Sequence, residues 1–474
     1  MRAIAPVAAI LLALLTAVLR PAVAATGAPV LDGAQLGPAW TAPFVILLAA
    51  IALLPVAAPH FWHRHYGKVA NLCALGFLVP CAVMFGFDVA LYEFLHAVLL
   101  DYVPFVVLLL ALFTCAGGVR ITGTMIGTPA VNTSILALGT ILASWMGTTG
   151  ACMLLVHPLI RANRWRARST HVFVFFIFLV GNIGGALTPL GDPPLFIGFL
   201  QGVDFFWVTT RLFAPMLVVA IPLLVVFFAI DSVLYAREGQ PPPELLMSDE
   251  PLGIDGKRNL ALLVLVVATV LAVGIWPRPF AVELYHVELG FNRIAGVLAL
   301  AALAFLSWRI TRRETRARNQ FSWFPMVEVT KLFFAIFVTI VPVIAIIRAG
   351  TGGVARAVVA LANPGGRPDE TMYFWITGML SSVLDNAPTY LIFFNLAGGD
   401  AGTLMGPLAG TLVAISAGSV FMGALTYIGN APNFLVRTIA AERGIAMPSF
   451  LGYATWAVAF LAPLFALVSF VFLR

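Results

Sequence analysis

Two aspartates lie in apolar stretches of this chain, where a charged side chain is costly. Asp192 stands in a Gly-Asp-Pro-Pro motif, and Asp385 stands directly before Asn386 and close to a proline. An ionisable residue at membrane depth marks an ion pathway or a proton relay by default. Both aspartates are therefore candidates for a transported or coupling ion, with one carboxylate from each half of the chain.

The residues around the two aspartates carry oxygen atoms and no charge. Hydroxyl, amide and carboxylate oxygens are the groups that bind hard cations. We expect Na+ to bind at Asp192 and Asp385 and to compete there with protons, which is the minimum requirement for exchange. The other residues expected at this ion or substrate site are Asn386, Asn430, Thr148, Thr149, Thr188 and Thr426.

Less specific interpretations exist for each of these residues. Asp192 could be a plain helix N-cap followed by proline, and Asp385 could belong to a turn at the aqueous surface. Threonine hydroxyls in membrane helices often bond only to the preceding turn.

The same motifs are rich in residues that interrupt helices. Glycine and proline end one half-helix and start another, which leaves backbone N–H and C=O groups free to face a ligand. We expect broken spans over 188–194 and 426–432, and hairpin tips at 147–150 and 385–388. The interrupting residues are Gly191, Pro193, Pro194, Gly429, Pro432, Pro388, Gly147 and Gly150.

An internal repeat relates these four places. Residues 185–196 match residues 423–434 at seven of twelve positions, and the offset is 423 − 185 = 238 residues. The same offset aligns Gly147 with Asp385 and Thr148 with Asn386. An odd number of crossings in each copy predicts two inverted-topology repeats, each with a re-entrant hairpin and a broken helix. Such repeats are typical of secondary transporters whose site lies at the midplane of the membrane.

Composition and hydropathy provide the elements that must position these residues. Hydrophobic residues make up 61% of the 474-residue chain and charged residues only 10%, which predicts an all-α polytopic membrane protein. Non-helical tips at membrane depth must line protein or a wet cavity, which identifies 127–160 and 371–398 as hairpins. The expected spans are 42–58, 67–86, 101–118, 171–200, 211–235, 259–276, 293–308, 323–348, 404–440 and 450–473.

The basic residues predict the orientation of the chain. They gather in short connections, which the positive-inside rule places in the cytoplasm, with the C-terminus outside. Residues 1–25 resemble a signal peptide, and an uncleaved first helix is the alternative. The divisions expected after this leader are a first transport repeat over 42–235, a cytoplasmic linker over 236–258 and a second repeat over 259–474. We expect a multi-pass protein of the bacterial inner membrane, with lipid and a small ion or carboxylate as partners and no nucleic acid.

These motifs resemble the ion-transporter superfamily, which includes sodium/proton antiporters, citrate transporters and arsenite permease-like proteins. The resemblance is carried by residues 188–194, 381–388 and 426–433 and covers the chain from about residue 42 onward. It implies two hairpins, two broken helices, elevator-type alternation and a homodimer. The family's carboxylate carriers have Ser-Asn-Thr at the hairpin tips. Here the tips read Gly147-Thr148-Thr149 and Asp385-Asn386-Ala387, which favours the antiporter branch.

Three functions follow from this pattern, in decreasing order of support. The first is a sodium/proton antiporter with no cofactor beyond Na+ and H+. The second is a sodium- or proton-coupled transporter of citrate or dicarboxylates, although the motifs lack Arg and Lys. The third is an intramembrane aspartyl protease using Asp192 and Asp385, for which the expected Gly-x-Gly-Asp and Tyr-Asp patterns are missing. We therefore do not expect an enzyme.

Overall fold

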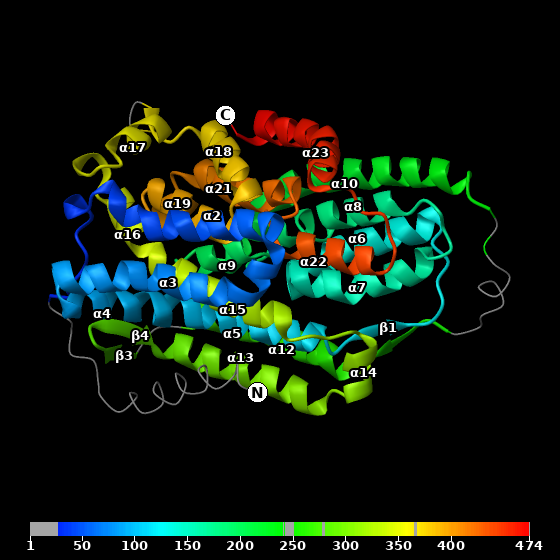
Figure 1. Cartoon of the computed structure of the whole chain (residues 1–474), viewed down its shortest axis with the longest axis horizontal. Helices are drawn as coiled ribbons and strands as arrows, with labels where there is room; N and C mark the ends of the chain where they lie inside the picture. Colours follow the sequence, from blue (N-terminus) through cyan, green and yellow to red (C-terminus); the bar gives the residue numbers. More distant parts are fainter. Residues whose placement is uncertain (1–26, 240, 242–250, 277–279, 365–366, 474) are drawn as a thin grey trace. The chain divides into compact units, whose positions relative to one another are not determined.

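The computed structural model describes residues 27–239, 241, 251–276, 280–364 and 367–473. The predicted leader, 1–25, lies outside these residues, and so do residues 240 and 242–250 of the predicted linker. The chain folds into helices with two short antiparallel ribbons, which confirms the all-α prediction (Figure 1).

Among the described residues, ten helical segments are long and apolar enough to cross a membrane. This finding confirms the polytopic membrane class. The ten segments are Pro38–Pro55, Pro59–Phe85, Phe87–Ala116, Pro129–Met146, Thr170–Leu187, Phe205–Tyr235, Lys257–Ile275, Phe291–Ile310, Phe324–Arg348 and Phe450–Phe472.

The ten segments differ from the ten expected spans in two places. Pro129–Met146, an arm of the first expected hairpin, is itself of membrane-crossing length. The expected span 404–440 contains the expected break, which falls between η7 (Met422–Leu425) and α22 (Ala431–Glu442). It differs from the expectation at its start, where α20 (Ala401–Met405) is separate from α21 (Ala409–Phe421). Gly406, which lies between α20 and α21, and the break before Ala431 account for the division.

The described chain forms two compact units, and each draws on both predicted repeats. The first unit contains the described residues up to Ala111 together with Leu265–Leu306 and Ser322–Arg367, and the second contains Leu112–Val264, Ser307–Phe321 and Pro368–Arg474. Three of the five unit boundaries fall inside helices, which are α5 (Val103–Ala116), α12 (Lys257–Ile275) and α13 (Phe291–Ile310).

In the first unit, α3 packs against α2, α4 and α15. The remaining bounds in this unit are η1 Gly33–Gln35, η2 Pro38–Thr41, α2 Ala42–Ala57, α3 Pro59–Phe85, α4 Phe87–His96, η3 Ala97–Tyr102, β3 Ala281–Leu284, β4 Val287–Gly290, α15 Phe324–Thr339, α16 Val341–Arg348, η5 Gly350–Gly352 and α17 Arg356–Ala362.

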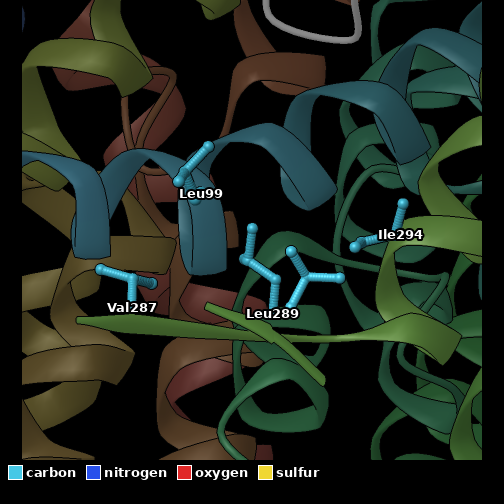
Figure 2. Packing of buried hydrophobic residues seen from close by; sticks show 5 residues of the cluster. Leu99, Val287, Leu289 and Ile294 are labelled. Carbon is cyan, nitrogen blue, oxygen red and sulfur yellow. The ribbon is translucent and has the colours of Figure 1, made fainter. Parts of the chain in front are cut away.

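The β3–β4 ribbon packs against the helix that runs through α4 and η3. Ala281 pairs with Gly290 in an antiparallel register. Figure 2 shows Leu99 of η3 above Val287 and Leu289 of the ribbon and Ile294 of α13, and these residues share one buried apolar cluster. Alternation of buried and exposed residues along β4 directs its apolar side chains to this helix.

The second unit contains both hairpins and both broken helices. Its remaining bounds are β1 Arg120–Thr122, α6 Pro129–Met146, α7 Thr148–Asn163, α8 Thr170–Leu179, η4 Ile183–Leu187, α9 Pro193–Leu200, α10 Phe205–Tyr235, β2 Gly253–Asp255, α14 Arg313–Arg318, α18 Glu370–Val383, α19 Asn386–Leu396 and α23 Phe450–Phe472. The elements recur at the predicted offset, since α9 begins at Pro193 and α22 at Ala431 (431 − 193 = 238). The inversion of one copy relative to the other stays a prediction.

The two copies interlock in this unit. The second hairpin helix of one copy contacts the second half of the broken helix of the other, α19 with α9 and α22 with α7 (Figure 1). The first hairpin turns at Gly147, whose φ of +81° favours glycine. The second tip needs no glycine, because Asp385 has a φ of −51°.

A buried polar network holds the ends of the first hairpin. Asp231 of α10 accepts hydrogen bonds from Asn132 at 2.9 Å and contacts His171 at 2.8 Å, and it pairs with Arg166 at 2.6 Å. Asn163 exchanges side-chain hydrogen bonds with Asn132. Burial of both charges makes the Arg166–Asp231 pair essential to this packing, because removing one partner would leave the other charge buried and alone.

Candidate functional site

The first broken helix stops and restarts around Asp192. Helix α8 ends at Leu179, η4 follows, and Thr188 is extended before α9 begins at Pro193. Asp192 occupies the N-cap position of α9, yet its carboxylate makes no capping hydrogen bond. Pro193 and Pro194 have no N–H, so the usual partner of an N-cap side chain at the second helical residue does not exist. The two prolines therefore leave the carboxylate free for other partners.

The second broken helix repeats this arrangement at Asn430. Asn430 is the N-cap of α22 and also makes no side-chain capping bond, and Pro432 removes the corresponding N–H. The backbone N–H of Asn433 donates instead to the main-chain oxygen of Asn430 at 3.0 Å. The amide of Asn430, like the carboxylate of Asp192, is thus turned away from its own helix.

Three donors converge on the carboxylate of Asp192. Oδ1 accepts from the Thr148 hydroxyl at 3.1 Å and from Nδ2 of Asn430 at 3.0 Å, and Oδ2 accepts from Nδ2 of Asn386. Asp192 is only 2% exposed. We call Asp192, Thr148, Asn386 and Asn430 the aspartate cage. It joins one hairpin tip and one break from each copy of the repeat.

Two further asparagines orient the cage. Asn430 Nδ2 also donates to the Gly181 carbonyl at 3.1 Å and lies 3.3 Å from Oδ1 of Asn182. Asn182 in turn donates to Oδ1 of Asn433 at 2.7 Å, and Asn433 donates to the carbonyls of Gly423 and Thr426, each at 2.9 Å. These bonds cross between the two broken helices and lock the Asn430 amide with its donor toward Asp192.

The second hairpin tip separates the roles of Asp385 and Asn386. The Asp385 carboxylate caps α19 by accepting from the Ala387 N–H at 3.3 Å. Asn386, the first residue of α19, is fully buried, and its Oδ1 has no hydrogen-bond partner. Among the described residues no hydrogen bond joins Asp385 to Asp192, but the two carboxylates are close enough to interact electrostatically.

Thr188 and Thr426 stabilise the breaks from within. The Thr188 hydroxyl donates to the Ser144 carbonyl and accepts from the Leu190 N–H at 3.1 Å. The Thr426 hydroxyl donates to the Ser382 carbonyl and accepts from the Gly429 N–H at 3.1 Å. Both hydroxyls thus tie a break to the hairpin of the same copy, across the same 44-residue separation.

The remaining predicted residues lie next to the cage, and the glycines among them allow close packing of the backbone. Thr149 follows Thr148 on α7 and is half-buried, and Pro388 is a buried residue in the first turn of α19. A Cβ on Gly191 would lie 2.2 Å from the Gly185 carbonyl oxygen, and a Cβ on Gly429 would lie 2.6 Å from the Gly423 oxygen. Gly150 packs with the Ala116 methyl group 3.1 Å from its ideal Cβ.

Sequence reasoning missed Asn182, Asn433 and Arg437. The three residues have no polar counterpart at the repeat offset, where Val420, Leu195 and Phe199 stand. A search for buried amides in apolar runs could have found the first two. Arg437 lies on α22 with its guanidinium 5.1 Å from the centre of the Tyr427 ring and 5.7 Å from that of Phe434.

The aspartate cage can hold a proton or a hard cation. One carboxylate supplies a single negative charge, and the unpartnered Asn386 Oδ1 supplies a neutral acceptor next to it. No group of three or more His, Cys, Asp or Glu side chains suited to a metal ion exists among the described residues. The cage thus offers one charged and one neutral oxygen group to a bound ion.

A multi-pass membrane fold with a buried ionisable cage between two broken helices defines a membrane transporter. The family described as "Putative citrate transport" matches residues 33–473 of the chain, which is nearly its whole length. The chain belongs to this family. Among curated proteins, none matches the sequence.

Proposed function

We propose that the protein is a secondary transporter that couples the movement of citrate or a related carboxylate to sodium ions or protons. The observation that carries the proposal is the burial of one carboxylate, Asp192, in a cage of amides and a hydroxyl within a chain of the citrate-transport family. This assignment reverses the order expected from the hairpin tips, because the family match favours carboxylate transport over sodium/proton exchange.

The chemistry of the cage suits a coupling ion. A cation near Asp192 would gain the attraction of the carboxylate, and Asn386 Oδ1 would gain a partner. The half-helix α22 begins at the second break, and helix N-termini favour negative charge, so this N-terminus is suited to a carboxylate substrate. A cation bound at Asp192 would neutralise that carboxylate and so remove its repulsion of an anionic substrate.

The location of the cage supports an elevator-type mechanism. Every residue of the aspartate cage belongs to the second compact unit, together with both hairpins and both broken helices. A site contained in one unit can be carried by that unit as a rigid body. We propose this movement for a homodimer in the bacterial inner membrane with its C-terminus outside the cytoplasm.

Sodium/proton exchange is the second candidate. It is favoured by the three neutral groups that donate to Asp192, because no Arg or Lys among the described residues forms an ion pair with this carboxylate. Proteolysis has no such support. Asp385 caps its own helix, and the Gly-x-Gly-Asp and Tyr-Asp patterns of an aspartyl protease are missing, so we infer that the protein is not an enzyme.

Transport by the purified protein in proteoliposomes tests the proposal. We expect radiolabelled citrate to accumulate when an inward gradient of sodium or protons is imposed, and not in its absence. A pH-sensitive dye inside the same vesicles reports exchange. Dissipation of a pH gradient by sodium without citrate, together with no citrate uptake under any gradient, would replace the proposal with the antiporter.

A further inference from the structure

The two broken helices carry opposite charges, although they are copies of one repeat. At equivalent positions the first break has Asp192 where the second has Asn430, and the second has Arg437 where the first has Phe199 (437 − 199 = 238). The first copy packs without a basic residue at this place, so the fold of a broken helix does not require one. We propose that Arg437 binds a carboxylate group of the transported di- or tricarboxylate. This inference rests on the proposed function, and it identifies Arg437 as the residue that binds the substrate.

Arg437 lies on the same face of α22 as Asn430. The spacing of seven residues, with Phe434 between them, places the three residues in one row along the helix. The adjacent face, with Asn433, Val436 and Ala440, is buried. Along the row, Asn430 at the break is buried, whereas Phe434 is 38% exposed and Arg437 is half-buried. The row therefore becomes accessible beyond the break.

The guanidinium of Arg437 is held toward the break. Side chains on a helix point to its N-terminus, and here the charge lies 5.1 Å from the centre of the Tyr427 ring, which belongs to the break itself. Tyr427 is a rigid support, because it stacks on Tyr453 at 4.1 Å between ring centroids and its hydroxyl donates to the Pro448 carbonyl at 3.2 Å. An arginine that served only to anchor the helix at the membrane surface would extend the other way.

Membrane depth makes this charge significant. Seven residues of helix separate Arg437 from Asn430, a rise of about 10 Å, whereas half the hydrocarbon core measures about 15 Å. The breaks are predicted at the midplane, which places Arg437 within the core. Charged residues there face a protein interior or a water-filled cavity and interact with a partner or a substrate.

Arg437 has no carboxylate partner in the part of the chain that the structure describes, where the ion pairs involve Arg120, Arg166 and two histidines. Its contacts are the faces of two aromatic rings. Cation–π contacts leave the N–H groups in the plane of the guanidinium free, and these form the fork that binds a carboxylate in two parallel hydrogen bonds. The site thus separates its charges, with the coupling cation at Asp192 and the substrate carboxylate at Arg437.

Citrate uptake by four proteins in proteoliposomes tests the inference: wild type, Arg437→Gln, Arg437→Lys and Arg443→Gln. Arg443 is the matched control, because it caps the C-terminal end of the same helix and is exposed. We expect the KM for citrate to rise about ten- to a hundredfold in Arg437→Gln, the range expected for a lost hydrogen bond to a charged group. Arg437→Lys should be intermediate, and Arg443→Gln should match wild type.

Two further readouts separate a binding role from a structural one. The sodium or proton concentration that gives half-maximal uptake should stay the same in Arg437→Gln. Citrate should raise the unfolding temperature of the detergent-purified wild type and Arg443→Gln, and should not raise that of Arg437→Gln. If Arg437→Gln has the citrate KM of Arg443→Gln, the inference fails while the proposed function stands. If the wild type takes up no carboxylate under any ion gradient, both fail.

Discussion

Substitution of Asp192 by asparagine should abolish transport and leave the protein folded. At an effective dielectric constant of about 20, a carboxylate attracts a cation 4 Å away by about 4 kcal/mol. Loss of this attraction corresponds to about a thousandfold weaker binding of the coupling ion. We therefore expect ion-driven uptake by Asp192→Asn to fall to the background of empty vesicles at sodium concentrations that saturate the wild type.

The stability of this variant follows from the hydrogen bonds of the cage. An amide oxygen in place of Oδ1 can still accept from Thr148 and Asn430, but the new NH2 group would face the Asn386 NH2. Rotation of the Asn386 amide relieves this conflict and costs no hydrogen bond, because its Oδ1 has no partner. The weaker neutral hydrogen bonds are offset by the removal of a buried charge, so we expect a small change in the free energy of unfolding.

Asp192→Ala provides the contrast. It leaves the Thr148 hydroxyl and the Asn386 amide without an acceptor, whereas Nδ2 of Asn430 keeps the Gly181 carbonyl. At about 1–3 kcal/mol for each buried donor, the free energy of unfolding should fall by about 2–6 kcal/mol before the structure relaxes. Thermal unfolding in detergent, followed by tryptophan fluorescence, measures both variants beside the wild type. Equal unfolding temperatures for Asp192→Ala and Asp192→Asn would show that the three donors do not meet this carboxylate. Transport by Asp192→Asn would show that its charge is not needed.

Three further substitutions test other parts of the second unit. Asp385→Asn retains a good N-cap, so we expect a stable protein. The sodium dependence of its uptake should shift less than that of Asp192→Asn. An unchanged sodium dependence would show that Asp385 acts only as a helix cap. Gly191→Ala places a methyl group 2.2 Å from a backbone oxygen across the break, so the yield of monodisperse protein in size-exclusion chromatography should fall sharply. Asp231→Ala leaves Arg166 buried without its partner and should lower the free energy of unfolding by about 3–5 kcal/mol.

Matched controls exist for the last two substitutions. Gly76→Ala adds the same methyl group in α3, where the nearest atom is 3.8 Å away, and should leave the yield unchanged. Asp204→Ala removes an exposed carboxylate at the start of the same helix that carries Asp231, and should leave the unfolding temperature unchanged. A normal yield for Gly191→Ala, or equal unfolding temperatures for Asp231→Ala and Asp204→Ala, would contradict the packing described above.

The membrane class and the places of the breaks could be predicted from the sequence, because length, apolarity and Gly/Pro punctuation are local properties of the chain. The helix ends around Pro193 and Asn430 follow from residues next to them. The start of the span 404–440 was misplaced, because α20 and α21 are separate helices on either side of Gly406 and Pro407. Hydropathy averages over a window and does not register a single residue that ends a helix.

The hydrogen-bond partners within the site could not be predicted from the sequence. Thr188 and Thr426 have the chemistry of cation ligands, but their hydroxyls bond to hairpin carbonyls of Ser144 and Ser382. Asn182 bonds to Asn433 from 251 residues away. Such pairs depend on how distant segments pack, and residue type and spacing along the chain do not determine them.

The repeat itself explains why the shared motif says so little about substrate. Asp192 and Asn430 occupy equivalent positions and are hydrogen-bonded to each other at 3.0 Å. Two aspartates at this distance would repel each other in a buried site, whereas an amide stabilises the single carboxylate. The two copies had to diverge here for one charge to persist. The same holds for Phe199 and Arg437, so the chemistry of the site depends on the positions where the copies differ. The residues that the copies share maintain the breaks, and those that they do not share should set which ions and substrates bind.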